Sequence, residues 1–92
     1  MSKTVFQVRI WRQNSGGSIG IARAEDSEEV ITLPPKSGAH EALSMAINYI
    51  ERKYSTQIIS VVLVPLEKVE EKTSVTEKYL VVTGPIDPFP VL

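Results

Sequence analysis

The chain has 92 residues, no cysteine, 42% hydrophobic and 23% charged residues, and a formal net charge of −1. This length and balance are typical of one small folded domain and exclude a disordered chain. The absence of cysteine excludes disulfides, a thiolate zinc site and a cysteine nucleophile, and it favours a reducing compartment. The first residues show no signal-peptide pattern, and the longest apolar run, residues 61–66, is too short to span a bilayer. We therefore expect a cytoplasmic protein.

Charge is unevenly distributed along the first third of the chain. The charged side chains of residues 1–24 are all basic: Lys3, Arg9, Arg12 and Arg23. Those of residues 25–29 are all acidic: Glu25, Asp26, Glu28 and Glu29. Four positive charges followed by four negative ones indicate either a basic patch beside an acidic patch or ordinary solvated surface.

The N-terminal third predicts a β-hairpin. Residues 4–12 alternate apolar and polar side chains, the period of a half-buried strand. Residues 14–18, Asn-Ser-Gly-Gly-Ser, predict the turn, because the two adjacent glycines can adopt positive φ at little cost. Residues 19–24 form the return strand, with Ile19 and Ile21 on one face. Residues 30–33 are either a third strand or a continuation past a bulge, and they end at Pro34.

Residues 37–54 predict the helix, with Ser37 as its N-cap. Apolar side chains recur at spacings of three and four along one stripe: Ala39, Leu43, Ala46, Ile47, Ile50 and Tyr54. Basic residues in the last turn suit the helix dipole. We expect Leu43, Ile47 and Ile50 to be buried against a sheet.

The C-terminal half predicts two more strands. Residues 57–66 are apolar on both faces, which indicates a central strand covered by the helix. Residues 67–72 are charged and are expected to extend as an exposed hairpin arm, with a turn near 72–74. Residues 75–83 form the last strand. The proline-spaced tail, residues 85–92, either packs as an extended strap or offers a hydrophobic ligand.

These elements predict a single domain over residues 1–92, of the α+β class. The economical arrangement is an antiparallel sheet of four to five strands, built from two hairpins, with one helix packed on one face.

No constellation of residues predicts chemistry. His40 is the single histidine, so a triad or a zinc site lacks the side chains it needs. Glu67, Glu70 and Glu71 belong to the expected arm, where a buried acid pair is disfavoured. The glycines at 16–20 lead into a strand and not a helix, which excludes a phosphate-binding loop. We expect no catalytic residue, no metal, no cofactor and no small-molecule substrate, and hence no enzyme.

Surface recognition is the remaining function. Arg9 and Trp11 share one strand face by alternation, and an arginine beside an aromatic suits phosphate contact, base stacking or a protein hot spot. Alternatively, Trp11 packs against the tail or the second hairpin. A free sheet edge is a second candidate interface, by strand addition. The expected partner-binding residues are Arg9, Trp11, Arg12, Arg23, Glu25, Asp26, Glu28 and Glu29.

From residues 2–9 to residues 84–88 the whole chain resembles the small phage-encoded anti-CRISPR proteins that act on type I-F surveillance complexes, in its size, its hairpin-helix-hairpin order and its mixed charge. The resemblance implies a stoichiometric inhibitor in the bacterial host cytoplasm. Such an inhibitor binds subunits of the RNA-guided complex, and in places its guide RNA, and prevents recognition of target DNA. The alternative is a small RNA- or DNA-binding regulator that uses the basic N-terminal hairpin alone; overall acidity argues against it.

Overall fold

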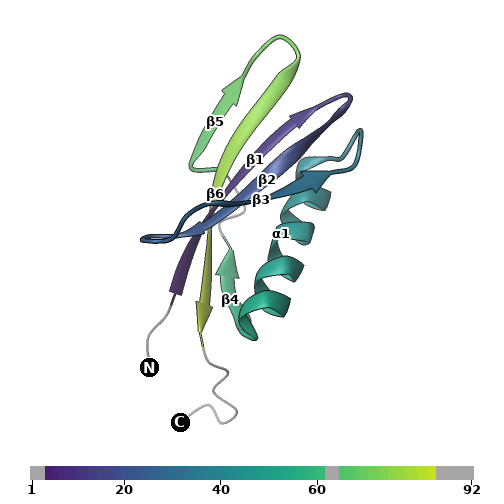
Figure 1. Cartoon of the computed structure of the whole chain (residues 1–92). Coiled ribbons are helices and arrows are strands. Elements are labelled where there is room, and N and C mark those ends of the chain that lie inside the picture. Colours follow the sequence, from purple (N-terminus) through teal and green to yellow (C-terminus); the bar gives the residue numbers. More distant parts are fainter. Residues whose placement is uncertain (1–3, 62–64, 85–92) are drawn as a thin grey trace.

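The computed structural model describes residues 4–61 and 65–84. Its elements are β1 (Thr4–Gln13), β2 (Gly16–Arg23), β3 (Glu29–Leu33), α1 (Ala39–Tyr54), β4 (Gln57–Val61), β5 (Glu67–Glu70) and β6 (Ser74–Gly84). The predicted α+β architecture is confirmed, since a single helix in the described part of the chain packs on one face of an antiparallel sheet (Figure 1). The expectations for Lys3, for residues 62–64 and for the tail at 85–92 lie outside the described residues.

The sheet is built outward from the two longest strands. β1 and β6 pair along their whole lengths, and β2 and then β3 follow on the other side of β1. The far side of β6 is shared, because β4 pairs with its C-terminal end and β5 with its N-terminal part. The sheet therefore has six strands but is five strands wide. The β1–β2 and β5–β6 hairpins are both as predicted, and β3 is a separate third strand.

The alternation along β1 decides which face is buried. Phe6, Val8 and Ile10 point to the helix side and are at most 1% exposed. The helix-side neighbours in the other elements complete the core: Ile19, Ile21, Leu33, Ala42, Leu43, Ala46, Ile50, Tyr79 and Val81. Each large apolar side chain buried in this way stabilises the fold by roughly 1.5–3 kcal/mol. The predicted burial of Leu43 and Ile50 is confirmed, while Ile47 is only partly buried at the margin of the core.

Helix α1 begins one residue later than expected. Its N-cap is Gly38, which makes no side-chain capping bond, so the expectation that Ser37 caps the helix is wrong. The Ser37 hydroxyl instead donates to the Pro34 carbonyl at 2.8 Å, a local bond that competes with capping. At the other end Ser55 adopts a left-handed conformation with φ of 48°, and the helix ends there.

One expectation about the sheet is also wrong. Segment 57–66 is not one central strand, because β4 ends at Val61 and, among the described strands, pairs with β6 alone. An apolar run indicates that side chains are buried, but it does not show whether a strand pairs with one neighbouring strand or with two. The first hairpin turns at Asn14 and Ser15, within the segment 14–18 predicted for it, and the glycine pair already belongs to β2. Gly16 opens β2 with φ of +124°, a conformation that needs glycine.

Candidate partner-binding surface

One face of the sheet is not covered by α1, and we call it the open face. By the strand register it carries Val5, Gln7, Arg9, Trp11, Ala22, Val30, Glu67, Val69, Thr76, Lys78, Leu80 and Val82. Antiparallel sheets commonly leave one face to water, so an open face alone indicates nothing. This one keeps three valines in solvent, with Val5 43%, Val30 63% and Val69 44% exposed. Together with Trp11 and Arg9, residue types that are enriched at protein interfaces, they make this face the candidate interface.

Four charged side chains cross the middle of the open face in one row. The register places Glu67 beside Lys78, and Lys78 beside Arg9. Lys78 Nζ lies 3.1 Å from Glu67 Oε2, and the Arg9 guanidinium forms an ion pair with the Glu28 carboxylate. Like charges directly opposite each other repel, and an acid on each flank offsets that repulsion. The row therefore presents two adjacent cations between two carboxylates.

Gly20 permits the outer end of this row. It lies opposite Arg9 on β2, and a Cβ at this position would overlap the carboxylate of Glu28. The missing side chain lets Glu28 fold back from the turn before β3 and lie over the sheet. The sequence places an acidic turn next to a basic strand, and Gly20 allows the two to meet.

Trp11 lies toward the hairpin end of the open face. Its cross-strand neighbours are Ser18 and Thr76, both small enough to leave the indole ring partly exposed. Trp11 is not a member of the buried hydrophobic core or of the partly buried residues that pack against it. Arg9 and Trp11 therefore share a face as the alternation predicts, and the neighbour that the second hairpin supplies to Trp11 is Thr76.

Arg12 and Arg23 do not extend this surface, contrary to the sequence-based expectation. Both alternate to the helix side of the sheet, where Arg12 faces Val75 and Arg23 faces Phe6. Since neighbouring residues of a strand point to opposite faces, a run of basic residues in one hairpin is divided between two surfaces. The eight expected binding residues thus lie in three places.

The first place is the open face, and the second is a buried polar cluster around Arg12 on the helix side. The Arg12 guanidinium pairs with Glu77, which is 4% exposed, and the Tyr79 hydroxyl donates to the same carboxylate at 3.1 Å. Burial and the bond to Glu77 together raise the pKa of Tyr79. Arg12 Nε is buried and has no hydrogen-bond partner among the described residues. A cluster of this kind is a structural element on the helix side and not a solvated patch.

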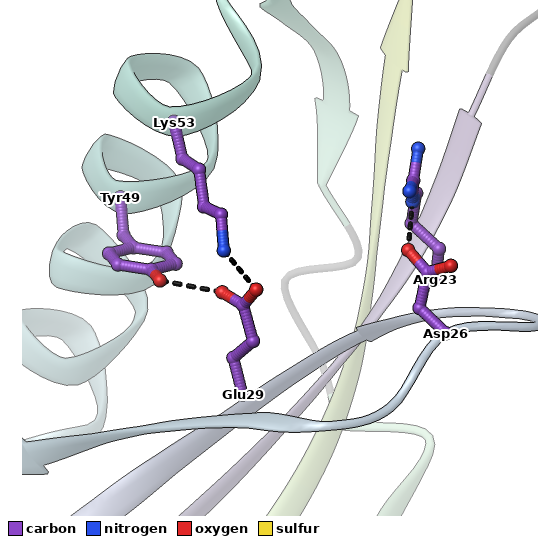
Figure 2. A network of polar contacts seen from close by, with 5 residues as sticks. All are labelled: Arg23, Asp26, Glu29, Tyr49 and Lys53. Carbon is purple, nitrogen blue, oxygen red and sulfur yellow. Dashed lines mark hydrogen bonds and ion pairs between the residues drawn. The ribbon is translucent and has the colours of Figure 1, made fainter.

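The third place is the region between the turn before β3 and the end of α1 (Figure 2). Arg23 pairs with Asp26, and its guanidinium carbon lies 5.1 Å from the centre of the Tyr54 ring. Glu29 accepts a 2.6 Å hydrogen bond from Tyr49 and forms an ion pair with Lys53.

These contacts shift the pKa values of the groups involved. Hydrogen bonds from Lys53 and Tyr49 lower the pKa of Glu29, and the same bonds raise the pKa values of Lys53 and Tyr49. The bond to Asp26 raises the pKa of Arg23. All four groups therefore keep their present protonation states over a wide pH range.

Folding thus pairs the two charge blocks of the sequence. Four of the expected binding residues meet each other across the turn, as Arg9 with Glu28 and Arg23 with Asp26. Glu25 is exposed in the turn itself. The segregation along the chain therefore becomes local ion pairs, and the open face carries a row of two adjacent cations with a carboxylate on each side.

The remaining groups that sequence analysis considered for chemistry lie apart from one another. His40 is exposed in the first turn of α1, and Glu67, Glu70 and Glu71 are exposed on the arm. Within residues 4–61 and 65–84 no group of three or more histidine, aspartate or glutamate side chains is placed to hold a metal ion. The helix that the structure describes is too short and too polar to cross a membrane.

Sequence analysis missed Lys78, Val30 and Val69 as members of the open face. Each belongs to a strand other than β1, and its place on the open face follows from the register between strands. The alternation within each strand was visible in the sequence, but the pairing of Lys78 with Arg9 was not. Comparison of the chain with family models, curated proteins and solved structures finds no match, so the surface itself carries the functional argument.

Proposed function

We propose that this domain is a non-enzymatic binding protein that recognises a macromolecular partner through the open face. The observation that carries the proposal is the exposure of Val5 and Val69 on the same surface as Trp11 and the charge row. Tryptophan and arginine are the residues most enriched among binding hot spots, and desolvating them at an interface contributes most of the affinity.

The arrangement of charge favours a protein surface over bare nucleic acid. Arg9 and Lys78 each have a carboxylate partner, so these two cations are each paired with an acid and do not form an unpaired cationic track. Binding to phosphates derives its affinity from cations that neutralise them, and acids alongside those cations weaken that effect. The net charge of −1 acts in the same direction.

The resemblance to anti-CRISPR proteins gives the proposal its specific form. The partner is a type I-F surveillance complex, and the domain occupies protein surface that the target DNA would otherwise use. The alternative, an RNA- or DNA-binding regulator, is favoured by one observation, namely that Trp11, Arg9 and Lys78 lie on one sheet face where a base can stack between cations.

Two substitutions on the open face test the proposal, Trp11→Ala and Arg9→Glu. Each should weaken binding to the purified type I-F complex by about 30-fold, the effect of losing a hot spot of roughly 2 kcal/mol. Lys68→Glu is the matched control, because Lys68 is exposed on the same sheet but on the opposite face. Thermal melting of each variant checks that the fold is intact.

The same variants separate the two candidate functions. Tight binding of the wild-type domain to free guide RNA, steeply reduced by salt, would replace the inhibitor with the regulator. Equal affinity of all three variants for the complex would show that the open face is not the interface.

A further inference from the structure

Strand β3 leaves one side of its backbone without a partner. It is the last strand in the sheet order and, among the described strands, pairs with β2 alone. In an antiparallel strand the N–H and C=O groups of one residue point to one neighbouring strand, and those of the next residue point to the other side. The backbone groups of every second β3 residue therefore point away from the sheet. Natural edge strands are commonly protected by lysine, proline or a bulge. The five residues of β3, EVITL, contain neither lysine nor proline.

An apolar groove runs beside this free edge on the helix side. It has a volume of about 650 Å³ and is lined by Ile31, Met45, Asn48, Tyr49, Arg52 and Lys53. Ile31 belongs to β3 and points to the helix side, opposite Ile19. The other five residues lie on one side of α1. The groove is therefore bounded by the edge strand and by the helix, with its basic end at the last turn of α1.

We propose that β3 and this groove bind an extended peptide segment of a partner protein, which adds to the sheet as a further strand. Main-chain hydrogen bonds to β3 hold such a segment, and alternate side chains point to the same face as Ile31. Those side chains enter the groove against Met45 and Tyr49. The intervening side chains meet Val30, which is 63% exposed on the other face of β3.

Charge specifies the peptide further. Lys53 is engaged by Glu29, whereas Arg52 is exposed and has no acidic partner among the described residues. A segment with apolar residues at alternate positions, and with a carboxylate at the end that lies near Arg52, matches the groove in both shape and charge.

Two other occupants fit less well. A second copy of the chain would bring its own Glu29, which is already bonded to Lys53 and Tyr49, and its own basic rim. Residues 85–92 of the same chain contain proline at 85, 88 and 90, and proline has no N–H to donate to a ladder. A partner peptide without these features is the occupant to which the geometry points.

The test is a selection of random peptides of about nine residues, displayed on phage, against the full-length domain, since that length covers an edge strand. We expect enrichment of peptides that alternate apolar residues and carry an acid at one end. Synthetic versions of the enriched peptides should lose affinity for Arg52→Glu by roughly tenfold, and replacing their acid by lysine should restore it. Lys68→Glu, far from the groove, is the control.

Strand addition has its own signature. N-methylation of alternate peptide residues in one register should abolish binding, and in the other register it should be tolerated, because only one set of N–H groups faces β3. Hydrogen exchange at β3 should slow only when the peptide is added. Trp11→Ala and Arg9→Glu should leave peptide affinity unchanged, so this proposal and the proposed function fail separately.

Three results would overturn the inference. One is the absence of any enriched peptide. Another is tolerance of N-methylation in both registers, which would exclude pairing with β3. The third is protection, in the free domain, of those β3 amides that point away from β2, which would assign the edge to the chain's own tail or, if sedimentation shows a dimer, to a second copy.

Discussion

The buried pair of Arg12 and Glu77 allows a sharp prediction about stability. Glu77→Gln keeps the shape of the side chain and removes its charge, which leaves a guanidinium whose side chain is only 22% exposed. Removing one member of a buried ion pair typically costs about 3–5 kcal/mol. Because about a fifth of Arg12 still meets water, we expect a cost somewhat below that range, about 2–3 kcal/mol. For a domain of this size that corresponds to a fall in melting temperature of roughly 10–20 °C.

The assay is urea denaturation of Glu77→Gln, of the single variants Glu77→Leu and Arg12→Met, and of the double variant Arg12→Met/Glu77→Leu that combines those two. If the loss comes from an uncompensated charge, the double variant should be more stable than the sum of the single losses predicts, with a coupling of more than about 1 kcal/mol. A Glu77→Gln variant within about 0.5 kcal/mol of the wild type would refute the reasoning. It would mean that Arg12 remains hydrated and is available to a partner.

Three further predictions follow from burial, titration and close packing. Ile50→Ala should lower the free energy of unfolding by about 2–5 kcal/mol, and Ile47→Ala by clearly less because its side chain is only partly buried, both measured in urea. Lys53 and Tyr49 on the helix lower the pKa of Glu29 below the ordinary 4.5. The ionised Glu29 therefore stabilises the folded state above pH 4.5, and this stabilisation is lost as pH falls through the lowered pKa. The difference in stability between the wild type and Glu29→Gln should therefore shrink as melts are moved from neutral pH to acid; a constant difference would contradict the ion pair. Gly17→Ala should cost roughly 1–3 kcal/mol because its Cβ would meet the backbone of the facing strand, whereas Gly20→Ala meets a carboxylate that can move aside and should cost less than about 1 kcal/mol in the same melts.

The fold class was predictable because each element carries its own period. Alternation in residues 4–12 identified β1 and its buried face, and spacings of three and four identified α1. Both signals are local, since each depends on the spacing of side chains only a few residues apart in the sequence. The errors concern what is not local. The apolar composition of the segment around β4 gave no information about how many strands would pair with it.

The candidate site was only partly predictable for the same reason. Arg9 and Trp11 lie on one face because they are two residues apart. Lys78 lies beside Arg9 because of the register between β1 and β6, which cannot be read from either strand alone. Gly20 leaves room for the Glu28 carboxylate, a contact that depends on how the turn before β3 folds. Charge segregation along the chain indicated separate patches, but a tight turn brings both blocks together. Arg23 pairs with Asp26 three residues away, whereas Arg9 reaches Glu28 only because the sheet brings the two together.

The most direct test of the central claim is oxidative footprinting of the domain alone and bound to the type I-F surveillance complex. Trp11 is the single tryptophan and lies on the open face, while Met45 lines the groove beside β3, and both side chains are readily oxidised. If the open face is the recognition surface, oxidation of Trp11 should fall severalfold on binding, while a fall at Met45 would instead assign the contact to the groove. Oxidation of Trp11 at an unchanged rate in the bound domain, or no binding of the complex at all, would contradict the account.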